Sequence, residues 1–253
     1  MELELWQFAV LFAAAFFGGF IDSIAGGGGL ISLPALLAVG VPPHVAIATN
    51  RFQGSFGSFT AALNFIRKGY VDAAEILRGV IFTFVGGLVG AYVLLLIDAK
   101  FLNYLIPILL LALLLYMIFS PNLGEAPARP KMSKNSFYAI FGIVLGFYDG
   151  FFGPGTGSFW TFALVGILGL YMKKAVAHTK VLNFTSNIVS LDVFIIGGQI
   201  LWLVGAVMAV GQIAGSFAGS SLVMRCDVKF VRKMLLFVVA ATILKLLYGL
   251  IAS

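Results

Sequence analysis

The sequence predicts an all-α integral membrane protein that consists of two five-segment halves related as an inverted-topology repeat. Of its 253 residues, 61% are hydrophobic and only 10% are charged, which is more apolar surface than a soluble domain of this size can bury. Two glycine-rich interruptions, residues 19–29 and 146–157, share an aspartate and two glycines at an offset of 127 residues. The composition places the chain in a bilayer, and the interruptions divide it into two matching halves.

Hydrophobic runs separated by turns or charges predict five segments in each half. The segment 30–40 is too short to cross a bilayer, because a helix rises about 1.5 Å per residue and the hydrocarbon core is about 30 Å thick. We therefore expect each half to contain a Gly-interrupted helical hairpin and three transmembrane helices. The segments are 5–24, 30–40, 45–66, 73–97 and 101–119, followed by 136–150, 157–171, 174–196, 200–224 and 229–250.

The glycine-rich interruptions are not ordinary helix. Four consecutive glycines, residues 26–29, follow Asp22, and a Gly-Pro-Gly-Thr-Gly sequence, residues 153–157, follows Asp149. Each glycine inside a helix costs about 1 kcal/mol relative to alanine. Irregular backbone at membrane depth is found only where protein or a water-filled cavity satisfies its polar groups. Both interruptions are therefore expected to border a cavity.

Matching residues outside the interruptions extend the repeat. Ala48-Thr49-Asn50-Arg51 aligns with Ala177-His178-Thr179-Lys180 at an offset of 129 residues. Two glycine pairs also match at this offset, although small residues spaced four apart have a simpler interpretation as packing faces between membrane helices. These pairs are Gly86 with Gly90, and Gly215 with Gly219. The expected organisation is a first membrane repeat at 1–120, a cytoplasmic linker at 121–135 and a second, inverted membrane repeat at 136–253.

The basic residues predict the orientation of the two halves. If each hairpin returns to its own side and three segments cross, 12 of the 16 lysines and arginines share one side and two lie toward the other. Cytoplasmic loops carry such an excess of Lys and Arg, so the linker is expected inside and both termini outside. The twelve are Arg67, Lys68, Arg78, Arg129, Lys131, Lys134, Lys173, Lys174, Arg225, Lys229, Arg232 and Lys233, and the two are Lys100 and Lys245.

Two cations remain, Arg51 and Lys180, and they are the aligned members of the repeat. Each lies seven residues after the start of its helix, which is about 10 Å deep at 1.5 Å per residue. A cation at that depth is costly and by default marks a substrate or ion pathway, whereas the simpler alternative is a side chain that snorkels to the interface. Polar neighbours favour the pathway: Thr49, Asn50 and Gln53 near Arg51, and Thr179 and Asn183 near Lys180. We expect replacement of either cation by glutamine to leave folding intact.

The two aspartates precede the glycine interruptions. Asp22 and Asp149 are expected to cap the half-helix that follows or to pair with a buried cation, and the alternative is a role in proton coupling. Asp192, His178 and Gln212 are weaker candidates. No second histidine or cysteine lies near His178, and the single Cys226 offers neither a disulfide nor a metal cluster, so no metal or cofactor is expected.

The interruptions suggest what the cations bind. The N-terminus of a half-helix offers free N–H groups and the positive end of a dipole, and glycine allows close approach of a ligand. Two such termini together with two cations form a positive cavity near the midplane that suits a small anion, and interrupted inverted repeats are the layout of secondary transporters. The expected substrate-binding residues are Arg51, Lys180, Asn50, Thr49, Gln53, Thr179, Asn183, Gly28, Gly29, Gly155 and Thr156.

These motifs resemble those of a known family. The stretch from Gly19 to Ile31, followed by Pro34 and by Ala48-Thr49-Asn50-Arg51-Phe52-Gln53-Gly54, resembles the TauE/SafE family of sulfite and organosulfonate exporters, closest to its YfcA-like bacterial branch. Arg51 stands where the family usually has lysine, which keeps the charge and changes the donor geometry. The resemblance covers essentially the whole chain and implies export of a small sulfur oxyanion across the bacterial inner membrane, with periplasmic termini.

Other classes of protein fit the sequence less well. An anion channel needs a continuous polar pore, and the chain has no ring of repeated charges. A transporter of another small oxyanion or a carboxylate remains an alternative. A membrane enzyme needs a nucleophile with a base, and Cys226 has no histidine near it in the sequence. The formal charge of +6 is explained by short loops, so no nucleic-acid partner is expected, and the oligomeric state is open.

Overall fold

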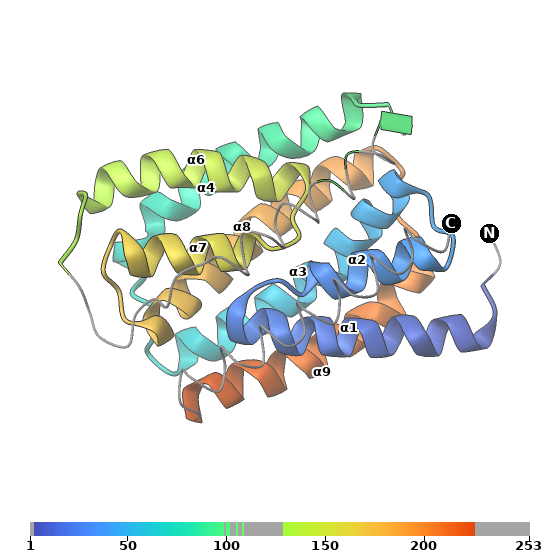
Figure 1. The fold of residues 1–253 in the computed structure, drawn as a ribbon, viewed down its shortest axis with the longest axis horizontal. Helices are drawn as coiled ribbons and strands as arrows, with labels where there is room; N and C mark the ends of the chain where they lie inside the picture. Colours follow the sequence, from blue (N-terminus) through green and yellow to red (C-terminus); the bar gives the residue numbers. More distant parts are fainter. Residues whose placement is uncertain (1–2, 99, 102–104, 106–107, 109–128, 226–253) are drawn as a thin grey trace.

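The computed structural model of the chain is all-helical throughout the residues that it describes, which are 3–98, 100–101, 105, 108 and 129–225. Eight helices lie within these residues and run roughly along the long axis of the molecule (Figure 1). They are α1 (Leu5–Ala25), α2 (Gly29–Ala38), α3 (Pro43–Arg67), α4 (Ala73–Leu96), α6 (Lys134–Phe151), α7 (Thr156–Gly166), α8 (Met172–Ile196) and α9 (Trp202–Arg225).

Eight of the ten expected segments are confirmed as helices, with ends within a few residues of the expected ones. The short segment after the first interruption is the 10-residue helix α2, and its counterpart α7 has 11 residues. Neither is long enough to cross a bilayer of about 30 Å at 1.5 Å per residue. The expected segment 229–250, nearly all of 101–119 and most of the linker 121–135 lie outside the described residues.

Helices α3 and α8 form the centre of the structure, because they pack against each other and against α9 and α4, respectively. Helix α1 packs along α9, and α6 packs along α4. Figure 1 shows that α1 and α6 begin at opposite ends of the molecule, α1 near the N-terminus and α6 at the far end. The two hairpins, α1 with α2 and α6 with α7, thus enter the bundle from opposite ends.

The distribution of polar and apolar side chains is that of a membrane protein. Large apolar side chains are exposed on the outer faces of α4 and α6, for example Phe84, Leu88 and Val144, whereas α3 and α8 bury many polar ones. Four described helices, α1, α4, α8 and α9, are long and apolar enough to cross a membrane. Helix α3 is as long as α8 and buries polar side chains along much of its length, among them Thr49, Arg51 and Gln53.

Glycines bring α1 against α9 and α4 against α6 at backbone distance. A Cβ added at Gly90 would overlap the carbonyl oxygen of Phe147, and one added at Gly219 would overlap that of Phe20. Gly86 and Gly215 make the same kind of contact with Ile143 and Phe16. The interpretation of these glycines as small-residue packing faces is therefore confirmed.

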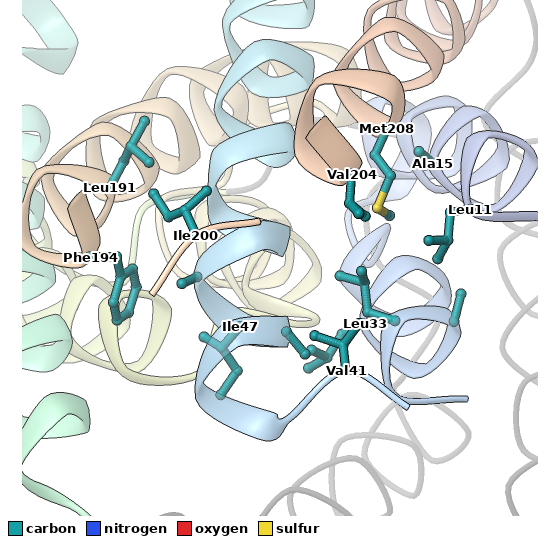
Figure 2. Close-up of a cluster of buried hydrophobic side chains, with 14 of the residues drawn as sticks. Leu11, Ala15, Leu33, Val41, Ile47, Leu191, Phe194, Ile200, Val204 and Met208 are labelled. Carbon is teal, nitrogen blue, oxygen red and sulfur yellow. The ribbon is translucent and has the colours of Figure 1, made fainter. Parts of the chain in front are cut away.

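Apolar clusters lie at both ends of the bundle, and one end adds ion pairs. At the end where α1 begins, a cluster joins α1, α2, α3 and α9 through Leu11, Leu33, Ile47, Val204 and Met208 (Figure 2). At the other end, where Phe65, Tyr138 and Trp160 are buried in two further clusters, Glu75 of α4 accepts from Lys134 of α6 at 2.7 Å and from Lys174 of α8 at 2.6 Å. These two lysines belong to the twelve cations that the sequence assigns to one side.

Candidate functional site

The two glycine interruptions have the backbone that their sequences predict. Gly26 has a φ of +75° and Gly153 a φ of +94°, which side chains with a Cβ rarely adopt. Helix α2 begins directly after Gly28, and α7 begins directly after Gly155. Each interruption thus ends one helix and starts a short one in a different direction.

The two interruptions touch each other at the centre of the bundle. Ser158 Oγ donates to the carbonyl oxygen of Gly26 at 2.9 Å. A Cβ added at Gly157 would stand 2.7 Å from Gly26 Cα, and one added at Gly29 would stand 3.1 Å from Pro154 Cα. Glycine is required here because two backbones approach within the space that a methyl group would fill.

Two buried ion pairs connect the halves of the chain next to these interruptions. Arg51 Nη1 lies 2.7 Å from Asp149 Oδ1, and both side chains are 4% exposed. Lys180 Nζ lies 2.8 Å from Asp22 Oδ2, with side chains 1% and 18% exposed. Each cation is therefore paired with the aspartate of the other half, and the snorkelling alternative for Arg51 and Lys180 does not describe their position.

The two aspartates differ in what else they bind. Asp22 Oδ1 accepts from the backbone N–H groups of Gly27 and Gly28 at 3.1 and 3.3 Å, which satisfies donors at the start of α2. Asp149 accepts instead from the hydroxyl of Ser186. Asp22 thus both caps a half-helix and pairs with a cation, whereas Asp149 is held by side chains of α3 and α8.

A cavity of about 40 Å³ lies between the two interruptions and helices α3, α8 and α9. Its walls are polar and combine the two aspartates and Arg51 with amide side chains and glycine backbone. A volume of this size has room for about three water molecules, since one needs roughly 10–15 Å³ of such space. The lining residues are Asp22, Gly29, Ser32, Asn50, Arg51, Gln53, Gly54, Asp149, Gly153, Pro154, Gly155, Gly157, Asn183, Asn187 and Gln212.

One edge of the Arg51 guanidinium is free. Nη1 donates to Asp149 and, at 2.7 Å, to Asn187 Oδ1, whereas Nε and Nη2 are buried without a hydrogen-bond partner in the described part of the chain. Nε and Nη2 lie on the same side of the planar group and donate in parallel. The side chain that lines the cavity therefore holds two unpaired, parallel donors.

The expected site residues divide into two groups. Asp22, Gly29, Asn50, Arg51, Gln53, Asp149, Gly155 and Asn183 line the cavity. Five others lie behind or beside it. Gly28 starts α2, Thr49 Oγ1 accepts from Leu201 N, Thr156 Oγ1 donates to Gly153 O, Thr179 Oγ1 contacts Thr161 Oγ1, and Lys180 is covered by Asp22.

The structure adds three polar side chains to the lining, those of Ser32, Asn187 and Gln212, together with backbone of the interruptions and of Gly54. Of these three side chains the sequence singled out only Gln212, as a weaker candidate. Ser32 Oγ lies 2.6 Å from Asn50 Oδ1. Asn187 follows Asn183 by four residues, so the two lie on one face of α8. That spacing was the available signal for Asn187.

No group of three or more His, Cys, Asp and Glu side chains that could hold a metal ion occurs in the described residues. His178 Nδ1 lies 3.2 Å from the hydroxyl of Tyr138, away from the lining of the cavity. The arrangement brings together two cation–aspartate pairs, the start of each short helix and several amide side chains at one polar cavity.

Comparisons with known proteins identify the family of the chain. Residues 11–246 match the model of the family "Sulfite exporter TauE/SafE". A probable membrane transporter protein of Haemophilus influenzae is 42% identical over 98% of this chain and 97% of its own length, and the probable membrane transporter protein YfcA of Escherichia coli K12 is 45% identical over 94% and 89%. The probable membrane transporter protein YunE of Bacillus subtilis is 26% identical over 85% and 88%. No solved structure matches the chain.

Proposed function

The chain belongs to the TauE/SafE family of sulfite exporters, and from this premise and the central cavity we propose that it exports a small sulfur oxyanion by alternating access. Family membership makes it a membrane transporter and not an enzyme. The proposal adds the substrate class, the binding residues and the mechanism. Sulfite is the first candidate, and short organosulfonates are the second.

The free edge of Arg51 is the observation that carries the proposal. Arg51 lines the cavity and carries two parallel N–H donors that are buried and have no partner among the described residues, and such donors fit two oxygens of one oxyanion. Sulfite and sulfonates present such oxygens, whereas a halide presents a single sphere. The backbone N–H groups at the start of the short helices add a positive dipole end beside the same cavity.

The size of the cavity favours a compact substrate. Its volume of about 40 Å³ accommodates the four non-hydrogen atoms of sulfite, since that volume holds about three water molecules. A longer organosulfonate would require the cavity to widen. Sulfite therefore fits the described conformation better than a larger sulfonate does.

The inverted repeat is part of the proposal. Helix pairs that are equivalent at the offsets of 127 and 129 residues make equivalent contacts, because α1 packs on α9 as α6 packs on α4. The contact of Gly215 with Phe16 matches that of Gly86 with Ile143. The two ion pairs also exchange partners between the halves. We assign residues 1–120 and 136–253 to the two repeats, and residues 121–135 to the linker.

Alternating access follows from two halves that meet at one site. The apolar cluster around Leu33 and Val204 closes one end of the bundle (Figure 2), and the Glu75 ion pairs join helices at the other. Opening either end while the other stays closed would expose the cavity to one side of the membrane at a time. We place the end with Glu75 in the cytoplasm of a bacterial inner membrane and both termini in the periplasm, because that end carries the lysines.

The experiment is transport into proteoliposomes that contain the purified protein. Radiolabelled sulfite, thiosulfate, sulfate and sulfoacetate are compared, with and without a proton gradient. We expect saturable sulfite transport that unlabelled sulfite inhibits. The double variant Arg51→Gln/Asp149→Asn should lose this transport, because it removes the two parallel N–H donors without leaving a buried charge unpaired. Transport of none of these anions by folded protein would contradict the proposal, and ion current without saturation would indicate a channel.

A further inference from the structure

Several residues that line the cavity carry unpaired acceptors as well as unpaired donors. The side-chain oxygens Gln53 Oε1, Asn183 Oδ1 and Gln212 Oε1 are buried and have no hydrogen-bond partner among the described residues. These three residues are 1%, 6% and 4% exposed, and all three line the cavity that also contains the free edge of Arg51. Buried polar atoms in folded proteins are nearly always hydrogen-bonded, so three unpaired oxygens in one small cavity point to a ligand that donates.

The orientation of one of these amides is set by its neighbours. Gln53 Nε2 donates to Asn50 Oδ1 at 2.7 Å, and Ser32 Oγ lies 2.6 Å from the same oxygen. Asn50 therefore presents its oxygen to two donors, and Gln53 uses its nitrogen for this contact. The oxygen of Gln53 is left as an acceptor in the cavity.

The charges of the site favour a monoanion. Arg51 and Lys180 contribute two positive charges, and Asp149 and Asp22 contribute two negative ones, at 2.7 and 2.8 Å from their partners. The charges of the four groups sum to zero, so the occupied site carries the net charge of the bound anion. The cost of burying a net charge rises steeply with its size, and a dianion is therefore disfavoured relative to a monoanion.

We propose that the cavity binds the protonated, singly charged form of its oxyanion, which is hydrogen sulfite in the case of sulfite. Two oxygens of the anion would accept from Arg51 Nε and Nη2, and its O–H would donate to the amide oxygens of Gln53, Asn183 or Gln212. This inference rests on the proposed function and names the form of the substrate. Each transported anion would then carry one proton across the membrane, and no residue of the protein would need to gain or lose a proton.

A sodium ion is the competing ligand for three amide oxygens, because hard cations take oxygen ligands. The cavity is bordered by the guanidinium of Arg51, and the ammonium of Lys180 lies directly behind Asp22. Each of these cations is paired with an aspartate, so the fixed charges do not decide between sodium and an anion. The unpaired Nε and Nη2 donors of Arg51 favour an anion, because a sodium ion would leave both without a hydrogen-bond partner.

The test compares two anions of the same shape and charge. Hydrogen selenite and bromate are both pyramidal, singly charged XO₃ ions, and only hydrogen selenite carries an O–H. Binding to the purified, detergent-solubilised protein is measured by calorimetry at mildly acidic pH, on Cys226→Ser so that no thiol reacts with selenite. We expect hydrogen selenite to bind roughly tenfold more tightly than bromate, which corresponds to one charged hydrogen bond.

Variants and a pH series test whether the O–H of the bound anion donates to an amide oxygen of the cavity. Gln212→Met removes one of the three amides at similar volume and should reduce the preference for hydrogen selenite over bromate severalfold if Gln212 is the acceptor, and Gln53→Met tests the second amide in the same way. Gln199→Met, outside the cavity, should change neither affinity. The apparent affinity for total selenite should fall as rising pH removes its proton. Bromate has no proton to lose, so its profile reports any titration of the protein.

The outcomes separate the two proposals. Equal or tighter binding of bromate, or a selenite affinity that stays constant with pH, would overturn the proton-bearing substrate and leave the transport of oxyanions standing. Binding of selenite that disappears when choline replaces sodium, and that Gln212→Met weakens unless the sodium concentration is raised, would assign the amide oxygens to a sodium ion. Failure of selenite, bromate and sulfite alike to bind folded protein would overturn the proposed function itself.

Discussion

Arg51 of α3 and Asp149 of α6 are 98 residues apart in the sequence, and their Nη1 and Oδ1 atoms are 2.7 Å apart in the structure. Both side chains are 4% exposed, so neither charge is solvated by water. The cation of one half is thus neutralised by the aspartate of the other. This pairing changes what a single substitution at Arg51 does, because it leaves a buried carboxylate without its partner.

The first prediction concerns stability. We expect Arg51→Gln alone to destabilise the protein by about 3–5 kcal/mol, the usual cost of breaking a buried ion pair from one side, and addition of Asp149→Asn to recover most of that loss. The sequence alone predicts that the single variant folds normally, whereas the buried ion pair leads us to expect a less stable protein. Thermal unfolding of purified variants, followed by size-exclusion behaviour, measures both effects.

Glu75→Gln is the matched control for this cycle. It removes two ion pairs in which the lysine side chains are 58% and 26% exposed, and exposed pairs contribute about 1 kcal/mol or less. Arg51→Gln could lose no more stability than Glu75→Gln, or the double variant could recover none of the loss. Either result would show that Arg51 and Asp149 do not stabilise each other.

The second prediction concerns selectivity. Arg51→Lys should keep the charge opposite Asp149 and lose the parallel Nε and Nη2 donors, so we expect oxyanion affinity to fall roughly tenfold. Chloride, which gains nothing from two parallel donors, should bind with little change. Competition of sulfite and chloride for binding to wild type and variant gives the ratio. An unchanged ratio would mean that the free edge of Arg51 does not contact the anion.

The helices were largely predictable from the sequence, because hydrophobic runs and glycine or proline turns define where a helix begins and ends. Glu75, Lys134 and Lys174 gather at one end of the bundle, as the assignment of cations to one side implies. The position of Arg51 well inside its helix was also predictable, since α3 begins at Pro43, close to the expected start.

The rotation of each helix was not predictable, and the partners depend on it. Thr49 and Asn50 are adjacent in sequence, yet Asn50 lines the cavity and Thr49 bonds to Leu201 N, because neighbouring residues on a helix point about 100° apart. The choice of Asp149 and not Asp22 as the partner of Arg51 likewise depends on how the halves pack. A sequence states which residues are polar, and packing decides which of them meet.

The third prediction concerns the contact between the two interruptions. Gly26→Ala should prevent folding or cost several kcal/mol, because Gly26 has a φ of +75° and an added Cβ would overlap the backbone of Gly157 and Ser158. Gly40→Ala is the matched control, since Gly40 also has positive φ, +86°, and nothing lies within 4 Å of an added Cβ. We expect that control to lose only about 1–2 kcal/mol. Equal losses in thermal unfolding would mean that backbone strain alone, not the contact, requires glycine.

The fourth prediction concerns topology. Lys68 ends α3 and Gly197 ends α8, at equivalent positions of the proposed repeat and both exposed. In the Cys226→Ser background, Lys68→Cys should react with a membrane-impermeant thiol reagent only after the cells are opened, and Gly197→Cys should react in intact cells. Labelling of both cysteines from the same side would contradict the inverted repeat.

The last prediction separates the two roles of Asp22. Asp22→Asn keeps a side-chain oxygen for the N–H groups of Gly27 and Gly28 and loses the charge that pairs with Lys180, whereas Asp22→Ala loses both. Loss of an N-cap costs about 1 kcal/mol, so Asp22→Ala should be less stable than Asp22→Asn by about that amount. If Asp22 caps and pairs without carrying protons, substrate binding in Asp22→Asn should keep the shape of the wild-type pH profile, because the proton then resides on the substrate. A profile that becomes flat in Asp22→Asn, with binding retained, would instead assign proton coupling to this aspartate.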